Sequence, residues 1–270
     1  MTLSREEIDR DLAFAIEAAA SAGRRALGLR KTGRWEGRVM ADVGDQACDG
    51  FLQGFVRGRY PADGLLSEET KDTPRRTEKE RAWIVDPLDG TREFSEGRAD
   101  WAVHVALTVG GRCALGAVAL PSQGRTIFGV ALAGHERFGV EGEGALIGGD
   151  SESADPPRVA VSRSHTPEWI EKFVAAVGGT KVAAGSVGHK VSLLLLGEAD
   201  LYVHKVGLKE WDTCAPEVVA RALGWTVSKL RGEEHAYNRP DPYNHELVVC
   251  RPSWHGRVVE ALASSGALDD

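Results

Sequence analysis

The chain has 270 residues, of which 42% are hydrophobic and 27% are charged, proportions typical of a globular protein with a large core. Its 40 acidic and 33 basic residues give a formal net charge of −7, which disfavours a nucleic-acid or anionic-membrane partner, because such binders need a basic excess. The 4 cysteines are far apart, so neither a zinc site nor a disulfide framework is expected. The polar N-terminus and the lack of a long apolar run predict a cytoplasmic protein without a membrane segment.

Two helical patterns open the chain, and a series of strands follows. Ser4 and Glu7 are spaced as a capping box, and apolar residues then recur at helical spacing to about Leu29. A second helix is expected from about Asp45 through Phe55. Four strand-like runs separated by glycine-containing turns predict an antiparallel meander, at residues 102–109, 113–120, 126–132 and 136–140.

A polar segment rich in glycine and proline, residues 148–157, is the expected boundary between two subdomains, 1–150 and 151–270. Beyond this segment, strand-like and helical patterns alternate, which indicates an α/β arrangement. The expected elements are strands at 159–161, 200–204 and 247–250, helices at 167–177 and 186–196, and a helix that Asp212 opens.

The most informative segment is residues 86–92, with the sequence DPLDGTR. The β-rich apolar run at 82–85 predicts a buried strand that delivers Asp86 and Asp89 to its end. Two carboxylates this close are unfavourable without a cation between them, and a hard divalent metal is the simplest candidate. Gly90 permits a tight turn, after which its N–H and that of Thr91 can hold a phosphate.

A plain turn is the alternative for this motif taken alone, because Asp, Pro and Gly are ordinary turn formers. Two other acidic clusters favour the metal site. Glu68 and Glu69 follow a short apolar run, and Asp212 precedes an amphipathic stretch, where it could equally cap the helix. Three acidic clusters at the ends of apolar elements are harder to explain as turns and helix caps than one such cluster alone.

In order and spacing, these clusters resemble the signature of the inositol monophosphatase-like, lithium-sensitive, magnesium-dependent phosphomonoesterases. The match spans essentially the whole chain. Ser186, Lys190 and the segment 210–213 make it most similar to the bacterial CysQ-type 3'(2'),5'-bisphosphate nucleotidases. The resemblance implies an α/β (α+β) fold, the layered αβαβα sandwich of these sugar phosphatases.

The implied activity is hydrolysis of the 3'-phosphate of adenosine 3',5'-bisphosphate to AMP and phosphate, a reaction of sulfur assimilation. The resemblance also implies two or three Mg²⁺ ions, inhibition by Li⁺ and a small nucleotide as substrate, and it is compatible with a homodimer. Inositol-1-monophosphatase and fructose-1,6-bisphosphatase activities are alternatives, because they share the metal core. A non-catalytic sensor of the bisphosphate nucleotide is a more remote alternative.

The resemblance implies oxygen ligands for two Mg²⁺ ions: Glu68, Asp86, the Leu88 carbonyl, Asp89 and Asp212, with Thr91 as a further candidate. Asp86 would bridge the two ions. Ions roughly 4 Å apart would lower the pKa of a bound water and stabilise the leaving oxygen. No phosphoenzyme is expected, because the motif contains no nucleophilic Ser or Cys.

Asp45 and Thr91 match the family's proton-accepting pair, although a helix cap would equally explain Asp45. Ser186 and Lys190 match residues that would meet the second phosphate, although an N-capping serine and a solvated lysine are the alternative. His204 lies near the position where inositol phosphatases carry an acid for a ring hydroxyl. A basic residue there favours a substrate with a second negative group.

Overall fold

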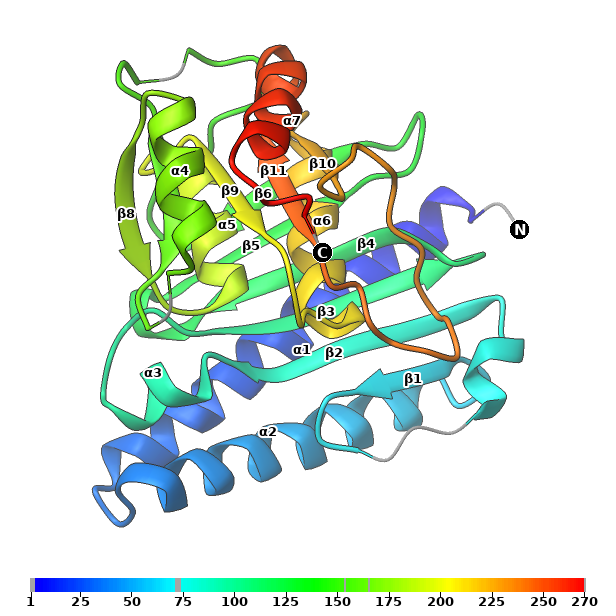
Figure 1. Cartoon of the computed structure of the whole chain (residues 1–270). Helices are drawn as coiled ribbons and strands as arrows, with labels where there is room; N and C mark the ends of the chain where they lie inside the picture. Colours follow the sequence, from blue (N-terminus) through cyan, green and yellow to red (C-terminus); the bar gives the residue numbers. More distant parts are fainter. Residues whose placement is uncertain (1–2, 71–73, 153, 165, 270) are drawn as a thin grey trace.

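The computed structural model describes residues 3–70, 74–152, 154–164 and 166–269, which form five layers (Figure 1). Helices α1 (Arg5–Lys31) and α2 (Gly37–Arg59) cover one face of a six-stranded sheet. Helices α5 (Val187–Leu195) and α6 (Glu210–Ala222) lie between this sheet and a five-stranded sheet. Helices α4 (Glu168–Ala176) and α7 (His255–Ser264) cover the outer face. The predicted αβαβα layering is confirmed.

The six-stranded sheet contains the predicted antiparallel meander. Its order is β1-β2-β3-β4-β5-β6, and β1 runs parallel to β2 while the following neighbours pair antiparallel. The strands are β1 (Gly64–Ser67), β2 (Arg81–Asp89), β3 (Ala102–Val109), β4 (Arg112–Leu120), β5 (Arg125–Val130) and β6 (Arg137–Glu141). The pairing of β2 with β3 shifts register between Asp86 and Asp89, so the strand is distorted where these two acids lie.

The five-stranded sheet has the order β10-β11-β9-β7-β8. Strand β7 runs parallel to β8 and β9, whereas β11 pairs antiparallel with both β9 and β10. The strands are β7 (Arg158–Ser162), β8 (Thr180–Ala184), β9 (Leu201–His204), β10 (Thr226–Ser228) and β11 (Leu247–Cys250). Helices α5 and α6 share one apolar core with both sheets. The expected division of the chain into two subdomains at about residue 150 stays a prediction.

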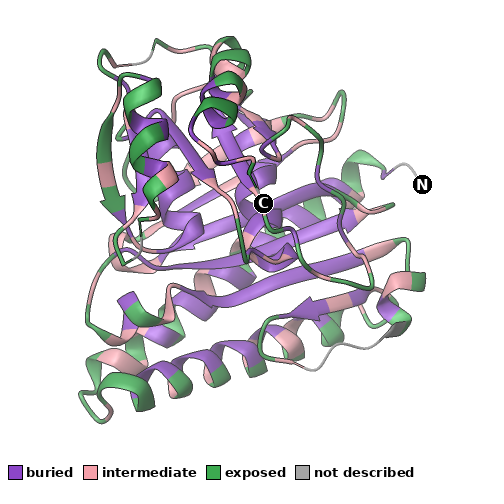
Figure 2. Cartoon of the chain, viewed as in Figure 1, coloured by how far each residue is buried: buried purple, intermediate pink, exposed green. Residues whose placement is uncertain are grey.

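Burial follows the layers. The central strands of both sheets are buried, whereas the edge strands β6 and β8 and the outward sides of α2, α4 and α7 are largely exposed or half-buried (Figure 2). Small alanines on the inner face of α1, among them Ala15, Ala19 and Ala22, let this helix pack closely on the sheet. In the part of the chain that the structure describes, no helix has the length and apolar character needed to cross a membrane. The cytoplasmic location and the homodimer stay predictions.

Helix α1 begins as predicted, with Ser4 and Glu7 in a capping box. Helix α2 does not begin where it is predicted, because it starts at Gly37 rather than at Asp45. The interpretation of Asp45 as a cap is therefore wrong, since Asp45 lies about two turns inside the helix. Gly44 resembles a helix boundary in the sequence but serves close packing, because a Cβ there would crowd the side chains of Leu88 and Phe94.

Candidate functional site

Three predicted ligands come together between the two sheets. Asp86 and Asp89 lie on the last part of β2, and Asp212 lies in the first turn of α6. Each aspartate offers a carboxylate oxygen, and these three atoms lie within 4.8 Å of one another. The Asp212 carboxylate also accepts a hydrogen bond from the Lys209 backbone N–H at 2.7 Å, which fixes it at the start of the helix.

The acids repel one another. Asp86 is 1% exposed, and burial together with the charges of Glu68 and Asp89 raises its pKa well above the ordinary value. Burial and Asp89 raise the pKa of Asp212 to about 6. Glu68 is exposed by its surface area, yet partial desolvation and the charge of Asp212 raise its pKa to about 7. A site of this kind favours an added cation.

Asp89 differs because donors surround it. It accepts hydrogen bonds from the backbone N–H groups of Val187 at 3.2 Å and Gly188 at 2.6 Å, at the start of α5. His104 Nε2 lies 3.1 Å from Asp89 Oδ2. Burial alone would raise the pKa of Asp89, but His104 and Gly188 outweigh it and lower the pKa. Position 188 needs glycine, because a Cβ would collide with the His104 ring.

Glu68 and Glu69 follow the end of β1, outside the close group of three aspartates. The Coulomb effect of Glu68 on Asp86 nevertheless links it to that group. A basic residue that sequence reasoning missed, Lys209, also acts on this region. Its charge opposes the rise in pKa at Glu68 and Glu69, and its Nζ lies 4.7 Å from the centre of the Trp211 ring.

The turn after Asp89 brings three predicted groups into hydrogen-bonding distance. The Leu88 N–H donates to Asp86 Oδ1 at 3.0 Å, and the Thr91 hydroxyl donates to the Leu88 carbonyl at 3.1 Å. Gly90 has a φ of 90°, and a Cβ there would lie 3.0 Å from Cβ of Ser186. Glycine at this position therefore allows both the turn and the close approach of the α5 start.

Asp45 faces the same turn from α2. It is 7% exposed, and its Oδ1 has no hydrogen-bond partner among the described residues. Burial and the charges of Glu69 and Glu68 raise its pKa to about 8, and a hydrogen bond with Thr91 partly opposes this. The predicted Asp45–Thr91 pair is thus brought together, and its role in proton transfer stays a prediction.

The predicted substrate contacts lie on α5 and β9. The Ser186 hydroxyl accepts the N–H of His189 at 3.0 Å and caps α5. Lys190 is not a solvated surface residue: it is 4% exposed, and burial lowers its pKa to about 8. Its ammonium donates to the Gly185 carbonyl and lies 5.2 Å from the centre of the Tyr202 ring.

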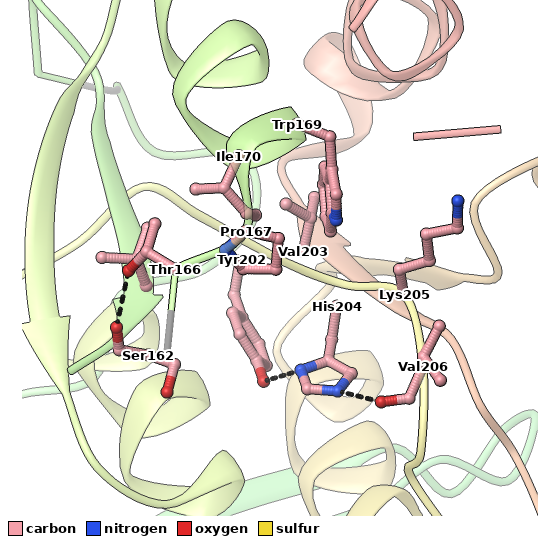
Figure 3. Close-up of a pocket in the computed structure, with 11 residues that line it drawn as sticks. Ser162, Thr166, Pro167, Trp169, Ile170, Tyr202, Val203, His204, Lys205 and Val206 are labelled. Carbon is pink, nitrogen blue, oxygen red and sulfur yellow. Dashed lines mark hydrogen bonds between the residues drawn. The ribbon is translucent and has the colours of Figure 1, made fainter. Parts of the chain in front are cut away.

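A pocket of about 420 Å³ opens beyond Tyr202. Its lining includes Trp169, Ile170, Tyr202 and His204, so it is largely apolar and aromatic. Figure 3 shows the Tyr202 hydroxyl directed at the His204 ring, where Oη lies 3.3 Å from Nδ1. His204 Nε2 lies 2.8 Å from the Val206 carbonyl. The contacts therefore run from Lys190 through Tyr202 to this pocket.

Comparisons with known proteins agree on one family. Residues 6–267 match the inositol monophosphatase family. The 3'-phosphoadenosine 5'-phosphate phosphatase of Mycobacterium leprae is 37% identical over 252 residues, covering 89% of each chain. The protein of that name from Mycobacterium tuberculosis is 35% identical over 233 residues, covering 84% of this chain and 83% of its own.

Solved structures support the same conclusion. CysQ from Bacteroides thetaiotaomicron has a TM-score of 0.75 at 26% identity, covering 90% of this chain and 97% of its own. The inositol monophosphatase from Anabaena has a TM-score of 0.76 at 18% identity, covering 97% and 98%, and shows the shared fold. The predicted resemblance is confirmed, and the chain belongs to the inositol monophosphatase family, as a phosphatase of the kind that family contains.

Proposed function

We propose that this protein hydrolyses the 3'-phosphate of adenosine 3',5'-bisphosphate, giving AMP and phosphate. The observation that carries the proposal is the path from the acidic cluster through Lys190 and Tyr202 to an aromatic pocket of about 420 Å³. A buried ammonium suits a second phosphate, and an apolar aromatic pocket suits a nucleobase. Relatives named 3'-phosphoadenosine 5'-phosphate phosphatase, at 35% and 37% identity, support the same substrate.

The site fits a hard divalent cation, because its donors are carboxylate and carbonyl oxygens and the acids repel one another in the absence of a cation. We propose Mg²⁺, in two or three positions. Glu68, Asp86 and the Leu88 carbonyl would hold one ion, and Asp86, Asp89 and Asp212 a second. Mg²⁺ bound there supplies a Lewis acid for the phosphoryl oxygens and a water of lowered pKa.

The chain's own groups would orient the phosphate and move the proton. The N–H groups of Gly90 and Thr91, at the turn after the motif, would donate to phosphoryl oxygens as charge develops on them. The Thr91 hydroxyl would take a proton from the attacking water and pass its own proton to Asp45. Asp45 is buried and its Oδ1 has no hydrogen-bond partner among the described residues, so this carboxylate has an oxygen free to accept the proton once it is ionised.

The rest of the substrate would extend along α5 and β9. Lys190, with the Ser186 hydroxyl, would bind the 5'-phosphate, while the base would enter the pocket beside Tyr202 and His204. The contact of Lys190 with the Gly185 carbonyl holds the ammonium at the start of α5, beside Ser186. Thus the ammonium of Lys190 would select a bisphosphate.

Lithium is expected to inhibit the enzyme, because Li⁺ is close to Mg²⁺ in size but carries half its charge. It would occupy an oxygen site without stabilising the leaving group equally well. We further propose a cytoplasmic enzyme of sulfur metabolism, in keeping with its nucleotide substrate. Inositol monophosphate and fructose 1,6-bisphosphate remain competing substrates, but neither has a base to fill the aromatic pocket.

A phosphate-release assay tests the proposal. Adenosine 3',5'-bisphosphate, inositol 1-phosphate and fructose 1,6-bisphosphate are compared with Mg²⁺, with EDTA, and with Mg²⁺ plus LiCl. We expect Mg²⁺-dependent, Li⁺-inhibited release that is fastest with the nucleotide. Faster hydrolysis of inositol 1-phosphate would assign the competing activity. Nucleotide binding without any phosphate release would instead support a non-catalytic sensor.

A further inference from the structure

One buried carboxylate holds both ends of the loop that carries Glu68 and Glu69. Asp49 lies on α2, 7% exposed, one turn after Asp45 and on the same side of the helix. Its Oδ1 accepts the Ser67 hydroxyl at 2.6 Å, and its Oδ2 accepts the Thr70 hydroxyl at 2.9 Å. Ser67 and Thr70 directly flank the two glutamates, so a single side chain fixes the loop at both of its ends.

Further contacts support this attachment. Gln53, one turn farther along α2, donates to Asp49 Oδ2 at 2.6 Å and also to the Thr70 hydroxyl. Ser67 is the last residue of β1 and pairs in register with Val85, the residue before Asp86. Figure 1 shows α2 running alongside β1 beneath this edge of the sheet. Asp49 therefore lies near the ends of β1 and β2, close to the acidic residues that these strands carry.

The loop needs such an attachment because its acids are repelled by the rest of the site. Glu68 and Glu69 are exposed, and Glu68 interacts unfavourably with Asp86 and Asp212. In the absence of a cation this repulsion favours movement of Glu68 away from the aspartates. Two hydrogen bonds to an acceptor on a long, packed helix oppose that movement.

We propose that Asp49 is a positioning residue that holds Glu68 and Glu69 in place for metal binding, through Ser67 and Thr70. The proposal rests on the metal site proposed above. Residues that orient metal ligands by hydrogen bonds typically change metal affinity 10- to 100-fold when they are replaced. We expect a loss of about that size when the attachment is removed. Asp49 itself need not contact the ion.

Asp49 could act simply through its negative charge, which also raises the pKa of Glu69. Three variants separate the effect of the charge from the effect of the attachment. The double variant Ser67→Ala, Thr70→Val keeps the Asp49 charge and removes both hydroxyl donors. The control Asp42→Asn removes an exposed charge from the same helix, and Asp42 also acts on the pKa of Glu69. Asp49→Asn removes both the charge and the preferred acceptor.

The experiment measures Mg²⁺ binding by calorimetry on the full chain without substrate, well below the melting temperature of every variant. We expect dissociation constants about 10- to 100-fold higher in Asp49→Asn and in the double variant, and within about twofold of wild type in Asp42→Asn. With substrate present, the Mg²⁺ concentration for half-maximal rate should rise equally, while the rate at saturating Mg²⁺ should recover. If Asp49→Asn does not fold, Thr70→Val alone, at a half-buried position, provides the test.

Unchanged Mg²⁺ affinity in the double variant would overturn the proposal, as would an equal loss in Asp42→Asn, which would assign the effect to charge. A lower melting temperature of the metal-free variants with wild-type Mg²⁺ affinity would also overturn it, by showing a purely structural role. If the wild-type protein bound no Mg²⁺, the proposed metal site would fail, and the role of Asp49 with it.

Discussion

The Nε2 atom of His104 lies 3.1 Å from Oδ2 of Asp89, and His104 has no exposed surface. Its Nδ1 lies 3.0 Å from the carbonyl of Trp211, the residue before Asp212. One ring thus contacts a carboxylate of β2 and the start of α6. Burial alone would lower the pKa of His104, but Asp89 and the Trp211 carbonyl outweigh it and raise the pKa. A protonated ring here offsets part of the negative charge of the site.

Asp86 should be indispensable for activity. The Asp86→Asn variant keeps the shape of the side chain but removes the charge that both proposed ion positions share. We expect kcat to fall by at least about 10³-fold at saturating Mg²⁺. The metal-free variant should fold normally, and it should even be more stable, because the substitution removes a buried, repelled charge. Phosphate release and circular dichroism measure the two effects. Turnover close to wild type would contradict the assignment of Asp86.

The metal-free protein should lose stability as the pH rises. Glu68 has a pKa of about 7, Asp212 of about 6 and Asp45 of about 8, all above their unfolded values. The folded state therefore binds protons more tightly than the unfolded chain, and its stability falls as these groups ionise between about pH 4 and 8.

Melting temperatures between pH 5 and pH 8, in EDTA and in excess Mg²⁺, test this dependence. In EDTA we expect a fall of several degrees, at roughly 2–4 °C for each kcal/mol. Excess Mg²⁺ should abolish the fall, because a cation stabilises the ionised acids. Asp212→Asn should flatten the EDTA curve. A melting temperature that is constant or rises across this range in EDTA would show that the acids do not repel one another as described.

Much of the fold could be predicted because its signals are local. Glycine turns between alternating apolar runs defined the meander β3 to β6, and the capping box defined the start of α1. The sequence does not predict strand β8, because it is a mostly exposed edge strand that is held by pairing with β7 rather than by a hydrophobic pattern. The sequence predicts helix α2 too short, because Gly44 looks like a helix boundary. In the structure Gly44 lies inside the helix and allows close packing against Phe94, a contact between distant parts of the chain.

The acids of the site could be predicted from motifs, but their supporting residues could not. Asp49, His104 and Lys209 are ordinary helix, strand and loop residues in the sequence. Their contacts with Ser67, Asp89 and the Trp211 ring exist only once the layers are assembled. Lys190 was recognised through the family resemblance, and its burial against Tyr202 required the structure. Local sequence patterns thus identify the charged residues of the site, whereas tertiary packing determines which of their side chains are held in position.

A second buried acid should make stability depend on pH in the opposite direction. Glu217 on α6 contacts His235 Nδ1 at 2.6 Å, Arg221 Nε at 2.7 Å and the Tyr237 hydroxyl at 2.8 Å. Burial alone would raise its pKa, but His235 and Arg221 outweigh it and lower the pKa to about 2. This acid therefore stabilises the fold above about pH 4.5, and the contribution is lost as the pH falls toward 2.

Urea unfolding of Glu217→Gln at several pH values checks that contribution. At pH 7 we expect a loss of about 3 kcal/mol in unfolding free energy, because each unit of pKa shift corresponds to about 1.4 kcal/mol. The difference from wild type should shrink as the pH falls from about 5 to 3. Glu234→Gln, which affects an exposed ion pair with Arg112, should change stability by less than about 1 kcal/mol. A difference that does not vary with pH would point to lost packing instead.

Lys190 should determine the preference for a bisphosphate. Its ammonium is almost fully buried, so a phosphate that reaches it forms a charge-assisted hydrogen bond in a partly desolvated place. Such a bond contributes about 1.5–3 kcal/mol, or roughly tenfold to over a hundredfold in affinity. Lys190→Ala should therefore lower kcat/KM for adenosine 3',5'-bisphosphate by that factor, and for adenosine 3'-monophosphate much less. Lys181→Ala, which removes an exposed lysine paired with Glu171, is the matched control and should alter neither.

The effect of the Lys190 charge on substrate preference should also appear in the pH dependence of the wild-type enzyme. Because kcat/KM reports the free enzyme, the Lys190 pKa of about 8 should appear in its pH profile. The ammonium is charged below this value, so the ratio of kcat/KM for the bisphosphate to that for the monophosphate should be high near pH 7. It should fall as the pH rises through about 8, and Lys190→Ala should remove this fall. Equal losses on both substrates in the variant, or a ratio independent of pH in the wild type, would show that Lys190 supports the fold or the acidic cluster and does not select the substrate.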